Sequence, residues 1–210
     1  MVKKIGWVFF AVFAILIGLY PIIYFVMDRS FGLLSSKSNA LLQDNLWNIG
    51  FYTHIIFGGI ALLIGWIQFN KKLRLKNVTV HRNIGKLYII TVLASSIAGV
   101  YIGFFATGGI VSELGFILLG LIWFSTTLGA FLAIKKGNIK KHQKLMIYSY
   151  AACFAAVTLR IWLPILVIIH EGEFVPAYRI VAWLCWVPNI IVAFFITKKK
   201  SINSIVIETK

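Results

Sequence analysis

Six apolar runs, each about 20 residues long and so long enough to cross a bilayer core of about 30 Å, take up most of this 210-residue chain. Hydrophobic residues make up 60% of it and the mean hydropathy is +0.90, far more apolar than a soluble domain of this length. In lipid, each backbone polar group must be satisfied within its own segment. The sequence therefore predicts an all-α integral membrane protein, a six-transmembrane-helix bundle. The runs lie near residues 5–27, 47–69, 86–108, 114–134, 145–169 and 177–197.

The connections between the runs are short, so we expect one membrane domain over residues 1–210, with a short basic tail at 198–210. The first run follows Lys3 and Lys4, as a signal peptide would, but it is long and has no small-residue cleavage site before Asp28. It is therefore expected to stay as an uncleaved span. Cys153 and Cys185 lie inside predicted spans without CxxC spacing, which predicts buried free thiols and no metal cluster.

The net charge of +15 is distributed unevenly between the two sides of the membrane when the spans alternate. Only Arg29, Lys37 and Arg179 fall on the side that holds five of the six acids. The positive-inside rule then places both termini in the cytoplasm. This distribution favours anionic lipid head groups as partners of the basic loops and disfavours nucleic acid. The residues on the basic side include Lys3, Lys4, Lys71, Lys72, Arg74, Lys76, Arg82, Lys86, Lys135, Lys136, Lys140, Lys141, Lys144, Lys198, Lys199, Lys200 and Lys210.

Aromatic residues stand near the expected membrane interfaces and predict an aromatic belt, in which amphipathic rings lie at head-group level. They are Trp7, Tyr20, Tyr24, Trp47 and Tyr178.

Small and polar residues recur at helical spacing in three runs and mark faces that turn toward other helices, because lipid accepts Leu, Ile and Phe. Close helix packing alone explains most of the glycines and alanines. It does not explain why a histidine heads each stripe. The stripes are His54, Gly58, Ala61, Gly65 and Gln68; His81, Gly85, Tyr88, Val92, Ser95 and Gly99; and His142, Met146, Ser149, Cys153, Ala156 and Arg160.

The four histidines fall at two depths. With the second span running inward, His54 lies about 9 Å below the outer surface, at 1.5 Å per residue. His170 ends the fifth span on that outer side. His81 and His142 lie at the inner surface among lysines and arginines.

Arg160 lies about 15 Å from the outer end of its helix and faces the bundle interior near the level of His54. A charge at this depth costs about 3 kcal/mol on insertion scales, so a partner is expected. The predicted spans contain no Asp or Glu, which leaves carbonyls, an amide such as Asn189, water, a lipid phosphate or a bound ligand. Pro164 leaves the Arg160 carbonyl without its helical donor, which predicts a kink and offers a purely structural explanation.

Three motifs occur in order: H-x3-G-x2-AL-x2-G-x2-QF from His54, HR-x2-G-x2-Y from His81, and AAVTLR ending at Arg160. Together, over about residues 50–165, they resemble the bacterial membrane family called domain of unknown function 2306. The resemblance implies a multi-pass protein of the bacterial inner membrane and implies no reaction. More distantly, histidines at two membrane levels resemble the di-haem cytochromes b, although those proteins hold their ligands within the bilayer and His81 and His142 lie just outside the apolar runs.

One hypothesis is a b-type haem protein that transfers electrons. Neutral imidazoles are suitable axial ligands, so His81 with His142 would form the inner pair and His54 an outer ligand, with His170 a further candidate. Arg160 would hold a propionate or polarise a quinone carbonyl. The polar interior residues proposed to surround these sites are Tyr88, Ser149, Gln68 and Asn189, together with Tyr148 and Tyr150.

The alternative hypothesis is a non-redox membrane protein that binds a lipid or small carbonyl ligand, or that serves as a partner of other membrane proteins. A transporter would show internal repeats or pairs of broken helices, and the sequence indicates neither. It has no HExxH and no G-x-S-x-G, so no hydrolase or zinc-site motif assigns an enzyme activity. The sequence thus predicts the fold and leaves the activity open.

Overall fold

The computed structural model describes residues 2–29 and 32–208, with side chains for residues 5–29 and 32–199. The side chains of Lys3, Lys4, Lys200 and Lys210 lie outside these described ranges. Six helical stretches of the described chain are long and apolar enough to cross a membrane, which confirms the predicted all-α, six-span class. The stretches are Ile5–Val26, Asn45–Phe69, Val78–Gly103, Ile110–Lys135, Ile139–Ile169 and Phe174–Lys199.

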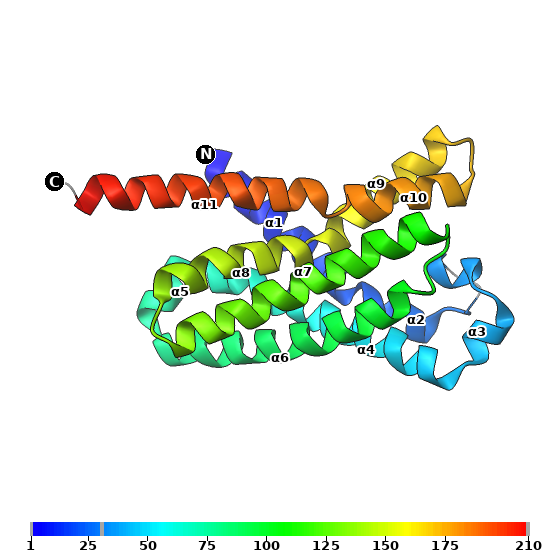
Figure 1. The fold of residues 1–210 in the computed structure, drawn as a ribbon, viewed down its shortest axis with the longest axis horizontal. Helices are drawn as coiled ribbons and strands as arrows, with labels where there is room; N and C mark the ends of the chain where they lie inside the picture. Colours follow the sequence, from blue (N-terminus) through cyan, green and yellow to red (C-terminus); the bar gives the residue numbers. More distant parts are fainter. Residues whose placement is uncertain (1, 30–31, 209–210) are drawn as a thin grey trace.

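The first two spans and the loop between them contain seven helical elements (Figure 1). These are α1 (Val2–Leu19), the 3-10 helix η1 (Tyr20–Ile22), α2 (Ile23–Val26), the 3-10 helix η2 (Gly32–Ser36), α3 (Asn39–Gln43), α4 (Asn45–Gly65) and the 3-10 helix η3 (Trp66–Phe69). The rest of the chain forms α5 (Lys71–Lys76), α6 (Val78–Gly103), α7 (Ile110–Lys135), α8 (Ile139–Cys153), α9 (Ala155–Ile169), α10 (Phe174–Leu184) and α11 (Val187–Glu208).

Side-chain caps fix where three of the spanning helices begin. The Asp44 carboxylate accepts from the backbone N–H of Trp47 at 2.7 Å at the start of α4. The side-chain oxygens of Asn77 and Asn138 do the same at the starts of α6 and α8. Each cap satisfies an N–H that has no partner within its helix, and it ends the preceding loop sharply.

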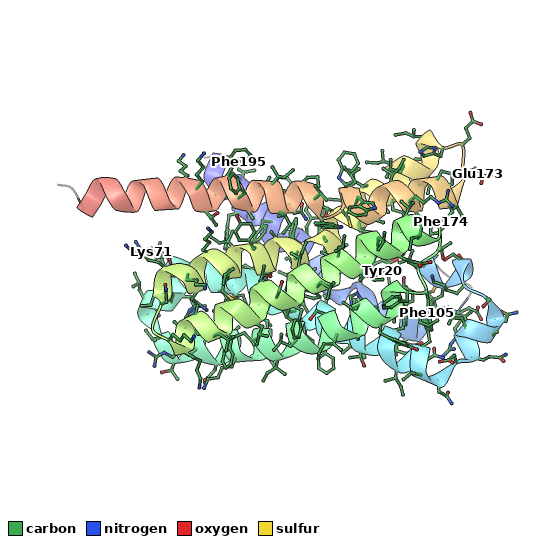
Figure 2. All side chains as sticks on the ribbon, in the orientation of Figure 1. Tyr20, Lys71, Phe105, Glu173, Phe174 and Phe195 are labelled. Carbon is green, nitrogen blue, oxygen red and sulfur yellow. The ribbon has the colours of Figure 1, made fainter. Side chains whose placement is uncertain are left out.

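The helices form a bundle in which neighbours along the chain pack side by side. The most extensive contacts join α4 to α6, α7 to α8 and α6 to α7, while α1 packs on α4 and α11 on α8. Figure 1 shows α5 at one end of the bundle, and the loop elements η2 and α3 lie at the other end. We call the end with Lys71–Lys76 the basic end; Figure 2 shows Lys71 there and Glu173 at the opposite end.

A chain of hydroxyl groups ties α6, α7 and α8 together in the bundle core. Thr127 donates to the Trp123 carbonyl at 2.7 Å, so its oxygen accepts from Ser149, also at 2.7 Å. Ser149 in turn accepts from the Tyr88 hydroxyl at 2.9 Å. Tyr88, Thr127 and Ser149 are all fully buried, and each hydroxyl has a partner, as a polar group inside an apolar bundle requires.

The last two spans are each interrupted. The fifth breaks at Phe154, between α8 and α9, and α9 then continues through Pro164 without a gap, so the interruption is not at the proline. The sixth breaks at Cys185 and Trp186, between α10 and α11. No broken helices were expected, and this part of the sequence interpretation was wrong. No glycine or proline adjoins the break at Phe154, whereas Pro188, the second residue of α11, follows the break in the sixth span and lacks the N–H that would continue the helix.

Side chains of the two broken spans satisfy the carbonyls beside the breaks. The Thr158 hydroxyl donates to the carbonyl of Cys185. The Asn189 amide donates to the Thr158 hydroxyl at 3.1 Å and to the Ala151 carbonyl at 3.3 Å. Asn189 therefore joins the two breaks, and no hydrogen bond to Arg160 is found for it in the described chain.

We predict that Gly65→Ala destabilises the bundle by about 1–3 kcal/mol through overpacking. A Cβ at Gly65 would lie 2.3 Å from Cε2 of Tyr150 and 2.7 Å from Cε2 of Tyr88. Gly85→Ala is the matched control, because its Cβ would meet only Oε1 of Gln68, at 3.8 Å. Unfolding in mixed detergent micelles measures both variants, and equal stability of the two would contradict this account of the Gly65 contact.

Candidate functional site

An internal cavity of about 210 Å³ lies between the spans in the half of the bundle away from the basic end. Seven helices, α2, α4, α6, α7, α8, α9 and α10, contribute to its wall, and the segment around η2 closes it on one side. Its polar lining side chains include Lys37, His54, Ser96 and Arg160. Of the described residues that line it, none is Asp or Glu. The aromatic lining residues are Tyr24, Trp47, Phe51, Phe116, Trp123 and Tyr178.

Arg160 reaches the cavity from the second turn of α9, just after the break at Phe154. Its Nη1 donates to the Ala156 carbonyl at 3.0 Å, one turn back along its own helix. The guanidinium carbon lies 4.1 Å from the centre of the Tyr20 ring, a cation–π contact. The Nε–H is buried and has no hydrogen-bond partner among the described residues. All of these partners are neutral, so no carboxylate of the described residues is seen to offset the charge.

His54 lies on the cavity wall with its tautomer fixed by α6. Its Nδ1 is 2.9 Å from the carbonyl oxygen of Ser95, which can only accept, so Nδ1 carries the proton. The Ser95 hydroxyl returns a bond to the His54 carbonyl at 2.8 Å. Gly99 makes this approach possible, because a Cβ there would lie 2.8 Å from Nδ1. The arrangement leaves Nε2 with its lone pair free to accept or to ligate.

Lys37 closes the cavity from the loop that follows η2. Its Nζ donates to the Phe105 carbonyl and, at 3.0 Å, to the Thr107 hydroxyl, while Ser36 and Thr107 share a hydrogen bond of 2.9 Å. Phe105 lies toward the end of the bundle opposite the basic end (Figure 2). Burial lowers the pKa of Lys37 to about 8 from its ordinary 10.5, because desolvation disfavours the ammonium form. The sequence interpretation treated Lys37 only as an outer-loop charge and missed this contact.

Three aromatic residues that the sequence assigned to an interfacial belt turn inward instead. Tyr24, Trp47 and Tyr178 are buried and line the cavity. Phe51 stacks on Trp47 with ring centroids 5.2 Å apart, which fixes that indole in place. The indole N–H of Trp47 is buried without an acceptor in the described chain. These residues belong to the candidate site. The sequence placed them near the ends of the spans and did not show that their rings point into the bundle.

The other predicted site residues lie elsewhere. His142 donates from Nδ1 to the Ala130 carbonyl at 2.9 Å near the basic end, and His81 lies close enough for electrostatic interaction with it. His170 follows α9 at the opposite end and does not line the cavity. In the core, Gln68 has a buried amide nitrogen without a partner in the described chain.

The tyrosines proposed to serve the inner histidines have partners of their own. Besides the Tyr88–Ser149 bond, Tyr150 donates to the Leu62 carbonyl at 3.1 Å, and Tyr148 bonds Thr197 at 3.3 Å. The two cysteines are free and buried, as the sequence predicts, and both line the cavity. The described residues contain no group of three or more His, Cys, Asp or Glu placed to hold a metal ion.

Comparison with known proteins supports the family resemblance seen in the motifs. Residues 51–197 match the family described as "Predicted membrane protein (DUF2306)". No curated protein and no solved structure matches the chain. The matched range contains His54, Arg160 and the two helix breaks, so most of the cavity wall lies within it.

We predict that the stability cost of Lys37 disappears as pH rises. The folded-state pKa is about 8 and the ordinary value is 10.5, so between these values the unfolded chain binds more protons and stability rises with pH. The difference in Tm between the wild type and Lys37→Met should therefore shift in favour of the wild type between pH 7.5 and 9.5. Thermal unfolding in detergent measures it.

Lys144→Met, which removes an exposed lysine at the basic end, is the matched control for the loss of one positive charge. A Tm difference for Lys37→Met that stays flat or moves the other way would show that an anion holds the Lys37 charge.

Proposed function

Since this match covers well over half of the chain, the protein belongs to that membrane family, and we propose that it binds a small, ring-sized ligand with oxygen acceptors in the cavity beside Arg160. The family description names no activity, so the proposal depends on the geometry. The observation that carries it is the pair of N–H groups, Nε of Arg160 and Nε1 of Trp47, that are buried on the cavity wall without an acceptor in the described chain.

Unpartnered donors at this depth favour a ligand that accepts from them. Each buried donor left unsatisfied costs about 1–3 kcal/mol, and more where the group is charged. A carbonyl or another acceptor oxygen bound beside either group would remove that cost for it. His54 offers the complementary chemistry, because its Nε2 can accept from a ligand O–H or N–H.

The volume and walls of the cavity limit the ligand to about one ring. An apolar cavity of about 150 Å³ is known to hold benzene, so about 210 Å³ suits a single substituted ring. A porphyrin, with four pyrrole rings, is larger than this space, so the cavity does not favour the hypothesis that places a haem at His54. The aromatic side chains around the cavity suit a flat apolar body.

The two broken spans also support a binding site here. Non-helical backbone at membrane depth is tolerated where it lines a cavity or is buried in protein, and discontinuous helices commonly build the ligand sites of membrane proteins. Ala155 and Cys185, one beside each break, both line this cavity. This argument favours ligand binding without specifying transport.

We further infer that the basic end faces the cytoplasm of a bacterial inner membrane, where its lysines contact anionic lipid head groups. The positive-inside rule and the polybasic α5 support this orientation. The cavity then lies in the outer half of the bilayer.

Duroquinone, a neutral ring with two carbonyl oxygens, tests the proposal. We expect it to bind the purified protein in detergent and to quench tryptophan fluorescence, because Trp47 and Trp123 line the cavity. Arg160→Gln should weaken binding by about 10- to 100-fold, which corresponds to the loss of a hydrogen bond from a charged group, about 1.5–3 kcal/mol.

The matched control is Arg82→Gln, which removes an exposed arginine at the basic end and should leave duroquinone affinity unchanged. Equal affinity of the wild type and Arg160→Gln would remove Arg160 from the site.

A second candidate function, haem binding at the basic end, is favoured by one observation. The Nδ1–H of His142 is held by the Ala130 carbonyl, the usual arrangement of a metal-ligating histidine, which leaves Nε2 available beside His81. Arg74 and Arg82 lie near His81 and could pair with propionates.

For this candidate, the visible spectrum of the purified protein, oxidised and then reduced with dithionite, should show a Soret band and sharp reduced-state bands. His142→Ala should abolish them and His54→Ala should retain them. A colourless folded protein from haem-sufficient cells would exclude the candidate.

A further inference from the structure

We infer that the cavity selects an anion, a carboxylate joined to an apolar ring or chain, and that Lys37 and Arg160 on its wall supply the positive charge. This inference depends on the proposed function and narrows it to a ligand class. Both cations line the same small cavity, Lys37 from the loop after η2 and Arg160 from α9. Nothing in the sequence suggested the pair, because the two residues lie far apart along the chain.

The charges on the cavity wall are of one sign. Lys37 and Arg160 contact only neutral groups, namely carbonyls, a threonine hydroxyl and an aromatic ring. No carboxylate lies among the described lining residues. Cations on the wall of a largely apolar cavity lose part of their hydration, and an anion bound in the cavity offsets part of this cost.

The remaining donors match a carboxylate. An ammonium group has three N–H donors, and Lys37 uses two of them, on Phe105 and Thr107. The Nε–H of Arg160 and the indole N–H of Trp47 are also unused in the described chain. A carboxylate has two oxygens and about four lone-pair sites, so these N–H groups can satisfy most of them. A phosphate would bring a third oxygen and leave more acceptors unsatisfied among the aromatic walls.

The state of Lys37 agrees with this assignment. Burial depresses its pKa to about 8, and burial is the only cause identified, so no protein anion offsets it. At pH 7 the side chain is still charged. It is also held in position by its bond to Thr107, which Ser36 bonds in turn, so the ammonium group is ordered on the cavity wall before a ligand binds.

Benzoate and benzamide, which have the same ring and nearly the same size, test the charge directly. Titration calorimetry at pH 7 in a neutral detergent should show the wild type binding benzoate at least tenfold more tightly than benzamide. Lys37→Met should lower the benzoate affinity by tenfold or more, since it removes a cation from the cavity wall, and should reduce the preference for benzoate over benzamide. Lys37→Arg, which keeps the charge, should retain most of the preference for benzoate.

A cooperative thermal unfolding transition of Lys37→Met shows that the variant is folded, so a loss of its preference for benzoate then reports the charge. Equal affinities of the wild type for benzoate and benzamide would overturn the anion inference and leave the proposed ligand site intact. Binding of neither compound, nor of duroquinone, would overturn both.

Decanoate, compared with decanol, distinguishes the two sources of a carboxylate. Tighter binding of decanoate than of benzoate would assign the site to the end of a fatty acid whose chain leaves the cavity between helices. Tighter binding of benzoate would assign it to a free aromatic acid. Decanol binding as tightly as decanoate would again contradict the selection of an anion.

Discussion

The cavity depends on how the structure satisfies backbone carbonyls where two spanning helices stop. Away from water, a carbonyl without a donor is costly, so a helix can be interrupted at this depth only if side chains supply the missing bonds. Thr158 and Asn189 supply these bonds. The Thr158 hydroxyl donates to the Cys185 carbonyl at the break in the sixth span. The Asn189 amide donates to the Ala151 carbonyl near the break in the fifth span and to the Thr158 hydroxyl, so it links the two breaks. With these bonds in place, α9 runs at an angle to α8 (Figure 1), and Arg160 reaches the cavity from the first turns beyond the break.

The two halves of the bundle therefore differ in their chemistry. Near the basic end, small residues admit large rings, as Gly65 admits Tyr150, and the Tyr88–Ser149–Thr127 hydroxyls satisfy one another. That half is densely packed, although Trp66 and Gln68 there each have a buried nitrogen without a partner in the described chain. Around the cavity, the cations meet only neutral groups, and Trp47, Trp123 and Arg160 each have a buried N–H without an acceptor in the described chain. Polar groups that satisfy one another stabilise a fold, whereas unsatisfied donors that converge on a cavity are the arrangement expected of a site for a polar ligand.

Sequence periodicity predicted the dense half better than the cavity. Spanning length and the small-residue stripes predicted six helices and the faces that carry Gly65 and Gly99, because lipid imposes a strict rule on which residues turn inward. The same rule placed Arg160 in the interior. It could not indicate the break at Phe154, because no glycine or proline adjoins that position. It also could not indicate the hydrogen bond from Lys37 to the Phe105 carbonyl, because that contact depends on how a loop folds over the end of the bundle. Trp47 and Tyr24 were misassigned to the interface for a related reason: depth along a span does not tell which way a ring points.

These differences explain why the histidines, the most prominent residues in the sequence, do not form one centre. His54, His81 and His142 each head a stripe, but His81 and His142 lie near each other at the basic end, whereas His54 lies in the other half of the bundle, so the stripes do not bring His54 to the other two rings. Each of His54 and His142 is instead bound to a carbonyl of the neighbouring helix, Ser95 or Ala130. The resulting Nδ1–H tautomer couples adjacent helices and still leaves Nε2 unused. His54 is part of the cavity wall, where Lys37, Trp47 and Arg160 carry N–H donors. The Nε2 of His54 adds an acceptor, so the site can both donate hydrogen bonds to a ligand and accept them from it.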